Sequence, residues 1–209
     1  MTQSTGNVNL ITAMNMNEYF NDAIQTAVAH QHLSRNDDTI VYIVNMLSHF
    51  SLSDNIYDGD ESEGRSVKPL AFIYKDAVEA NSDEERIQCL RKLGDVALFI
   101  AGFYSESLNR SMVGINYFAS MGGNAYSSLA DNAQRSAYYK AFGEVFSDLA
   151  EHFMAYVDVL MEVRDSTEVK QPSSILCLYE NWLSTGSDYA RKRLQENGIL
   201  TFPVGQQTH

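Results

Sequence analysis

The sequence has few of the features that mark a secreted, membrane-spanning or disulfide-bonded protein. Its two cysteines, Cys89 and Cys177, stand far apart without a C-x-x-C partner, which favours reduced thiols, although the sequence leaves open whether they pair. The longest apolar run, 96–104, is far shorter than the ~20 residues that a membrane-spanning helix needs. No basic and apolar leader opens the chain. We therefore expect a cytoplasmic protein without a membrane partner.

Basic residues are scarce as well. The chain has 15 Lys and Arg against 27 Asp and Glu, a formal net charge of −12. Such a chain repels phosphate backbones unless its basic side chains gather on one face. The densest basic cluster, Arg191-Lys192-Arg193, covers a single helical turn, and we interpret it as a solvated face. We expect no nucleic-acid partner.

Only three prolines and twelve glycines occur in 209 residues, which leaves room for long helices. A content of 44% hydrophobic and 20% charged residues is typical of a globular protein with a sizeable core. We predict one helical domain over 1–209. The segments 1–15 and 203–209 are expected to be mobile, and 53–66 is expected to be an acidic loop.

Apolar residues recur at spacings of three and four along most of the chain, which predicts helices. The expected helices cover residues 17–33, 38–50, 69–80, 83–104, 114–129, 133–163, 172–183 and a last segment from after Gly186 to about Asn197. Asp37 or Asp38 is predicted to cap the second of these. Ser82 and Glu85 have the spacing of a capping box.

The segment 133–163 has the strongest pattern. One stripe alternates spacings of four and three, and a second recurs every seven residues: Tyr138, Phe142, Val145, Leu149, His152, Tyr156, Val159 and Val163, then Tyr139, Phe146, Phe153 and Leu160. Two stripes imply neighbours on two sides, as for the central helix of a bundle. The predicted fold is therefore an all-α, single-domain bundle of seven or eight helices around one long central helix.

Small residues are unusually frequent between Leu93 and Ala130. Gly94, Ala97, Ala101 and Ser105 are closely spaced on one predicted helix, and Ala119, Gly122, Gly123 and Ser127 on the next. Because a glycine within a helix costs about 1 kcal/mol relative to alanine, these positions need an offsetting gain. We interpret them as sites of close helix contact. The alternative is that they make room for a ligand.

The candidate ligand-binding residues of that alternative come from the same two helices: Asp95, Tyr104, Asn116, Tyr117, Asn124 and Tyr126. Asp95 is the most informative because it follows Gly94 and precedes an apolar run, which predicts a partly buried carboxylate. A buried carboxylate must be paired or must take up a proton. Arg91, four residues earlier, is the expected partner.

Motifs of catalysis and metal binding are absent. The chain has no P-loop, dinucleotide-binding glycine motif, G-x-S-x-G or H-E-x-x-H, and no Glu-x-x-His precedes any histidine. The segment 53–66 fails the ligand spacing of an EF-hand. Asp148 and His152, with Glu144, are the best metal candidates, but we interpret them as a polar pair within a helix seam. We expect no catalytic residue, metal or cofactor.

The run 93–126 resembles a pattern found in uncharacterised bacterial all-helical proteins, which reads approximately LGD, a GFF-like turn, YY, MG and AY. The matching residues are Leu93-Gly94-Asp95, Gly102-Phe103-Tyr104, Tyr117, Met121-Gly122 and Ala125-Tyr126, whereas Asn116-Tyr117-Phe118 departs from the double tyrosine. The resemblance implies a helical fold and a bacterial source, and it brings no known activity.

Two functions therefore remain open. The first is a non-enzymatic binding protein with a protein partner or a second copy of itself, using the small-residue faces or the second stripe of the long helix. The second is a small-molecule binder or enzyme with an interhelical pocket near Asp95.

Overall fold

The structure, a computed structural model, describes residues 5–33, 36–51, 57–58, 66–104, 114–133, 140–167, 182 and 185–196. Within these residues the chain forms eight helices and one pair of two-residue strands. The predicted all-α bundle is therefore confirmed. The expected helix at 172–183 lies almost wholly outside the described residues, as do Cys177, 203–209 and most of the acidic loop.

The helices follow the predicted order. They are α1 (Thr5–His30), α2 (Asp37–Ser51), α3 (Leu70–Glu79), α4 (Asp83–Phe103), α6 (Ile115–Ala133), α7 (Lys140–Glu151), α8 (Phe153–Thr167) and α10 (Asp188–Glu196). The strands β1 (Tyr57–Asp58) and β2 (Ser66–Val67) pair antiparallel, with Tyr57 opposite Val67. Helix α1 thus begins earlier than the predicted start at Asn17.

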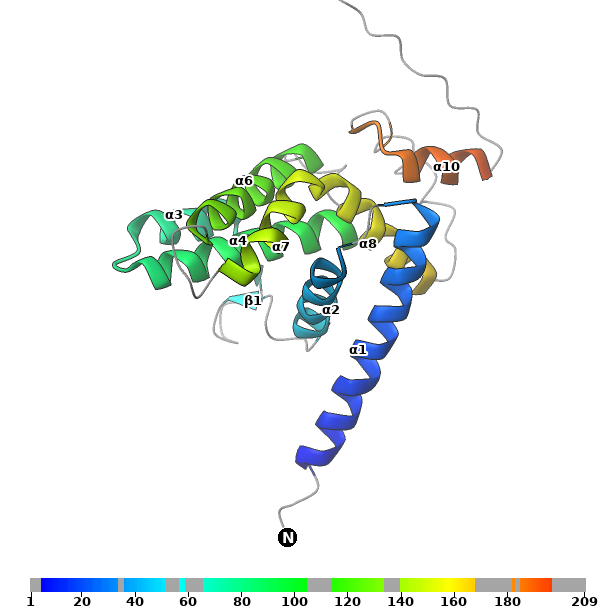
Figure 1. Cartoon of the computed structure of the whole chain (residues 1–209), viewed down its shortest axis with the longest axis horizontal. Helices are drawn as coiled ribbons and strands as arrows, with labels where there is room; N and C mark the ends of the chain where they lie inside the picture. Colours follow the sequence, from blue (N-terminus) through cyan, green and yellow to red (C-terminus); the bar gives the residue numbers. More distant parts are fainter. Residues whose placement is uncertain are drawn as a thin grey trace, which may run out of the picture.

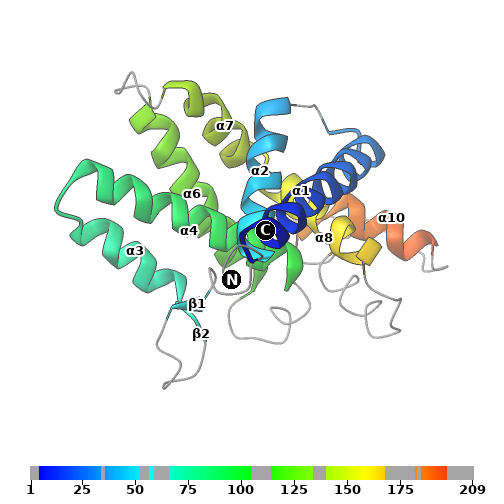
Figure 2. The same cartoon turned by 90° about the horizontal axis from the view of Figure 1, so that it is seen from below.

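Helix α4 lies at the centre of the packing. It contacts α3, α6 and α8, while α7 packs on α6 and α1 packs on α2 and α8. Figures 1 and 2 place α3 and α10 at opposite ends of the molecule, and the N-terminal end of α1 projects beyond the other helices in Figure 1. Among the described residues, no helix combines the length and the apolar character needed to cross a membrane.

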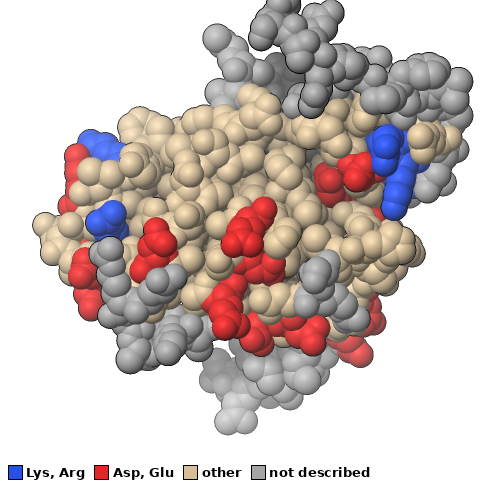
Figure 3. Space-filling view, turned by 45° about the horizontal axis from the view of Figure 1, so that its top comes forward, with Lys and Arg blue, Asp and Glu red and all other residues tan. Residues whose placement is uncertain are grey.

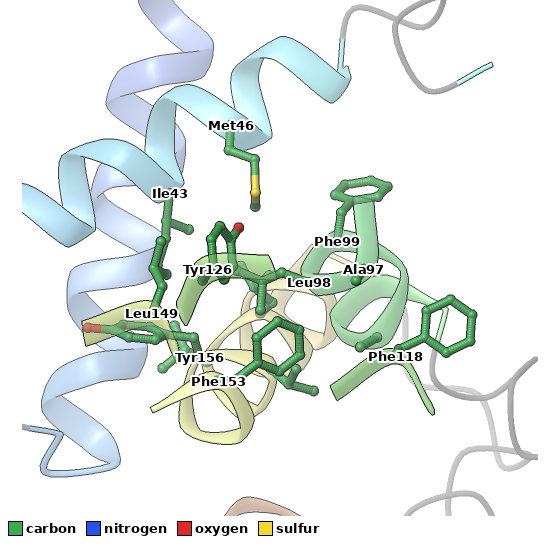
Figure 4. Packing of buried hydrophobic residues seen from close by; sticks show 14 of the residues in the cluster. Ile43, Met46, Ala97, Leu98, Phe99, Phe118, Tyr126, Leu149, Phe153 and Tyr156 are labelled. Carbon is green, nitrogen blue, oxygen red and sulfur yellow. The ribbon is translucent and has the colours of Figure 1, made fainter. Parts of the chain in front are cut away.

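One continuous hydrophobic cluster joins these helices. Its fully buried members come from nearly every helix and include Ile24, Ile43, Leu47, Leu93, Leu98, Leu149, Leu160 and Leu194. Figure 4 shows part of this core, where Tyr126 and Phe153 lie among Ile43, Leu98 and Leu149. Burial of such side chains contributes about 1.5–3 kcal/mol each, so the stripes read from the sequence account for the assembly.

The helix ends confirm one prediction and correct another. The Ser82 hydroxyl accepts a hydrogen bond from the Glu85 amide at 3.1 Å, and the Glu85 carboxylate accepts one from the Asn81 amide at 2.9 Å. Helix α2, however, is capped by neither Asp37 nor Asp38. The Asn36 side-chain oxygen accepts from the amides of Asp38 and Thr39, because asparagine just before the first helical residue reaches both.

The predicted helix 133–163 is wrong as an unbroken rod. It consists of α7 and α8, which meet at His152, and its stretch 134–139 lies outside the described residues. Hydrogen bonds from the amides of His152 and Tyr156 span the junction. The two parts have different main neighbours, since α7 packs on α6 whereas α8 packs on α4 and α1. The junction could not be seen in the sequence, because the apolar stripe continues through it and is buried in both α7 and α8.

The glycines of α4 and α6 confirm the interpretation of close helix contact. A Cβ at Gly94 would lie 2.6 Å from the ring of Tyr126, and one at Gly102 would lie 2.5 Å from Leu160. At Gly122 it would meet Phe153 at 2.5 Å and Ala97 at 2.9 Å. Gly123 differs, because its nearest neighbour is a backbone oxygen at 4.0 Å. At Gly94, Gly102 and Gly122, side chains of neighbouring helices thus occupy the space that a Cβ atom would need.

Candidate functional site

Asp95 lies in a buried polar cluster that joins three helices. Its Oδ1 atom accepts hydrogen bonds from the hydroxyls of Tyr42 in α2, at 2.6 Å, and Tyr126 in α6, at 2.8 Å. Arg91, one turn earlier in α4, lies 3.7 Å from Asp95 Oδ2, and its Nε donates to the Tyr42 oxygen at 3.2 Å. The predicted pairing of Asp95 with Arg91 is present, and the two tyrosines complete it.

Burial dominates the electrostatics of this cluster. It raises the pKa of Asp95, against the two hydroxyl donors and Arg91, which all favour the ionised form. Burial and the neighbouring carboxylate also raise the pKa of both Tyr42 and Tyr126, so their hydroxyls stay protonated as donors. The cluster therefore pins α2, α4 and α6 together by donors that converge on one carboxylate oxygen.

Aromatic rings surround the cluster. Phe146 stacks on Tyr126 with ring centroids 6.0 Å apart and meets Tyr42 edge-on at 5.6 Å. Phe153 lies against Tyr126 at 6.2 Å. Phe146 of α7 and Phe153 of α8 belong to the second stripe of the segment 133–163. Their rings thus form an apolar surround for Asp95 and its two tyrosines. The arrangement is that of a structural hydrogen-bond network.

The six candidate residues do not form one site. Asp95 and Tyr126 are in direct contact, whereas Tyr104 is 48% exposed and Tyr117 is 37% exposed. Asn116 and Asn124 also lie on the exposed face of α6. Helix α6 accounts for this separation, because Tyr126 is buried against α4 while Asn116, Tyr117 and Asn124 are exposed to solvent.

Sequence reasoning missed Tyr42, the residue that completes the cluster. Tyr42 lies within the apolar stripe of α2, next to Ile43, and is almost fully buried. A tyrosine in such a stripe needs a partner for its hydroxyl. That requirement was readable from the sequence, but the identity of the partner, 53 positions away, was not.

Asp148 and His152 form the polar pair that we expected within the helix seam. His152 Nδ1 lies 2.9 Å from Asp148 Oδ1, and the Tyr156 hydroxyl donates to Asp148 Oδ2 at 2.5 Å. Both carboxylate oxygens thus have partners within the chain, while Glu144 is exposed. Within the described part of the chain, no three His, Cys, Asp or Glu side chains are grouped to hold a metal ion.

A second buried carboxylate lies under the start of α10. The Ser187 hydroxyl donates to Asp158 Oδ1 at 2.7 Å and accepts from the Ala190 amide at 3.1 Å, so it caps α10 and anchors it to α8. Burial raises the pKa of Asp158 to about 7, with Asp188 acting in the same direction and the Ser187 donor in the opposite one. The docking of α10 therefore depends on a group that titrates near neutrality.

An open cavity of about 680 Å³ lies away from Asp95, between the C-terminal end of α1, the last turns of α8, and α10. Its walls include His30, His32, Glu162, Asp165, Tyr189 and Lys192. None of the six predicted site residues lines it. The cavity was not foreseen, because its walls come from three separate segments, one of which lies more than a hundred residues before the other two.

Comparisons with known proteins give no assignment. No family model matches the chain, and neither a curated protein nor a solved structure matches it. The resemblance to bacterial helical proteins therefore stays a prediction.

Proposed function

We propose that this chain is a non-enzymatic binding protein whose partner is a helical protein segment with apolar anchors and basic flanks. The docking surface is the outer face of α3. The main support is the exposure of large apolar side chains on this ten-residue helix. More than half of the surface of each of three such side chains is exposed: Phe72, Tyr74 and Val78. Such an apolar concentration on a short helix is typical of an interaction surface.

The packing of α3 supports this proposal. Leu70, Ile73 and Ala77 are buried, and α4 is the one described helix with which α3 packs extensively. Figure 2 shows α3 at the edge of the molecule beside α4, with no described helix on its other side. None of the described helices therefore covers the outer face of α3.

Two of the exposed residues, Tyr74 and Val78, form the anchor site. Tyr74 and Val78 are four residues apart, so they lie side by side on one flank, and Ala71 extends that flank by one turn. Phe72 lies on the opposite flank. A partner helix could place its apolar side chains between Tyr74 and Val78, in the i, i+4 mode common to helix recognition.

Charge selects the kind of partner. Acidic residues outnumber basic ones at the end of α3: Glu79, which lies 3.7 Å from Lys75, is followed by Asp83, Glu84 and Glu85 at the start of α4. The chain as a whole carries −12, and Figure 3 shows acidic side chains spread over one face while Lys and Arg form a few separate spots. A second copy would meet repulsion, whereas basic flanks would be attracted.

The surfaces first considered for a partner are used within the chain. Phe146, Phe153 and Leu160 of the second stripe are buried, and Gly94 and Gly122 contact neighbouring helices. The outer face of α3 is therefore a better docking surface than the second stripe or the small-residue faces. A cytoplasmic location and a bacterial source belong to the same proposal, supported by the isolated cysteines and by the resemblance of 93–126.

Peptide titration tests the proposal. An amphipathic helical peptide with leucines on one face and lysines on the other should bind the whole chain with a Kd in the range of about 10–100 μM. A peptide with glutamates in place of the lysines should bind at least about tenfold more weakly.

Val78→Lys should weaken binding of the lysine peptide at least about tenfold, because it places a like charge within the apolar contact. Val41→Lys is the matched control, since Val41 is 55% exposed on α2, away from α3. Equal binding by both variants would overturn the proposal. So would a dimer of the free chain that Val78→Lys dissociates, because the occupant would then be a second copy.

A further inference from the structure

The open cavity between α1, α8 and α10 has the properties of a ligand site and lies at the opposite end of the molecule from α3 (Figures 1 and 2). Its volume of about 680 Å³ falls within the range of about 300–1,000 Å³ that small-molecule sites occupy. Three helices supply its walls, so a ligand there would be enclosed from several sides.

The two carboxylates of the cavity already have hydrogen-bond partners. His30 Nδ1 lies 2.7 Å from Glu162 Oε1, and the Gln31 amide donates to Glu162 Oε2 at 2.9 Å. Arg164 donates to Asp165 Oδ1 at 2.7 and 3.0 Å, while the Tyr189 hydroxyl donates to Asp165 Oδ2 at 2.8 Å. Each of the four carboxylate oxygens therefore has at least one partner within the chain.

Basic side chains line two of the walls. Lys192 and Arg193 line the cavity from α10. The basic cluster 191–193 is therefore split: Arg191 pairs with the exposed Asp188 at 2.7 Å, while the next two residues reach the cavity. Because the chain carries a net charge of −12, two neighbouring basic residues on one cavity wall are unusual for it.

His32 lines the cavity from the end of α1, where its backbone has an unusual conformation. Its φ of 54° is left-handed, and the amides of His32 and Leu33 donate to the carbonyls of Ala29 and Val28 in the pattern of a Schellman motif. Glycine is the usual residue at this position. Here the chain instead places an imidazole at the cavity, with Ala29 and the ring of Tyr189 as less polar surface.

We propose that this cavity binds a small organic anion, whose carboxylate or phosphate group pairs with Lys192 and accepts a hydrogen bond from His32. Its apolar part lies against Ala29 and Tyr189. Because the oxygens of Glu162 and Asp165 already accept hydrogen bonds within the chain, a ligand that brings acceptors to Lys192 and His32 complements the other polar side chains of the site. This inference is independent of the binding face on α3.

The test uses three probes of the same shape: phenylacetate, phenyl phosphate and the neutral phenylacetamide. Calorimetric titration and saturation-transfer NMR of the full chain should show binding of at least one anion with a Kd of about 1 mM or tighter. Phenylacetamide should bind at least about tenfold more weakly. Comparison of the two anions distinguishes a carboxylate site from a phosphate site.

Two neighbouring variants separate the cavity from the general charge of the helix. Lys192→Gln should weaken binding of the preferred anion at least about fivefold, because the direct ion pair is lost. Arg191→Gln removes the same charge one residue away and should change binding less than about twofold. Equal effects of the two variants, equal binding of the neutral probe, or no binding by any probe would overturn the proposal.

Discussion

The Tyr42 hydroxyl of α2 donates a hydrogen bond of 2.6 Å to Asp95 of α4, across 53 positions of sequence. Tyr126 of α6 donates to the same oxygen atom, so one carboxylate holds three helices in register. Because both hydroxyls and the carboxylate are buried, each depends on the others for its hydrogen bonding.

Tyr42→Phe removes one of the two donors to a buried carboxylate and the acceptor of Arg91. It should lower the free energy of unfolding by about 1–3 kcal/mol in urea denaturation, and Tyr126→Phe should do the same. Tyr104→Phe is the control, because Tyr104 is 48% exposed, and it should change stability by less than about 0.5 kcal/mol. Equal stability of all three variants would show that the cluster contributes nothing.

Two adjacent glycines should respond to alanine in opposite directions. A methyl group at Gly122 would meet the ring of Phe153 at 2.5 Å, so Gly122→Ala should destabilise the fold by about 1–3 kcal/mol. At Gly123 the nearest atom is 4.0 Å away, so Gly123→Ala should stabilise it by about 0.5–1 kcal/mol through helix propensity. Thermal or urea unfolding measures both, and stabilisation by Gly122→Ala would contradict the packing described for α6.

Asp158 should make the docking of α10 depend on pH. Burial raises its folded pKa from 3.8 to about 7, so between these values the folded state holds a proton that the unfolded state has lost. Its contribution to stability is therefore greatest below pH 4 and falls as the pH rises to 7. Ionisation of Asp158 weakens the fold.

Asp158→Asn should remove this part of the pH dependence while keeping an acceptor for Ser187. Since each pKa unit corresponds to about 1.4 kcal/mol, the variant should be more stable than the unmodified chain by a few kcal/mol at pH 8 and by little at pH 4. Asp131→Asn, at an exposed position of α6, is the control. A stability difference that does not change with pH would contradict the assignment.

The fold was largely predictable because the local patterns agree with the tertiary packing. The stripes of α1 and α2 are buried as expected, with Phe20, Ile24, Ile43 and Leu47 in the core. The Ser82 cap is present where the spacing indicated. The junction at His152 was not predictable, because an apolar stripe records which side is buried and not where a helix changes neighbours.

The polar sites were less predictable because they depend on contacts distant in sequence. The apolar context of Asp95 indicated a buried carboxylate, and Arg91 at the i−4 position was the expected partner. Tyr42 and the cavity walls come from other helices, and no local spacing connects Lys192 to His32. The sequence also did not show that Asn116 and Asn124 are exposed while Tyr126 is buried, although all three belong to α6.

Chemical-shift mapping on the isotope-labelled chain tests the central claim, the docking of a basic helical segment on α3, most directly. Addition of the lysine-bearing amphipathic peptide should shift the backbone amides of residues 70–79 and of the acidic start of α4, with Val78 among the largest changes. These shifts should be absent in Val78→Lys and retained in Val41→Lys. Shifts confined to α1 and α10, or shifts that persist in Val78→Lys, would contradict the account.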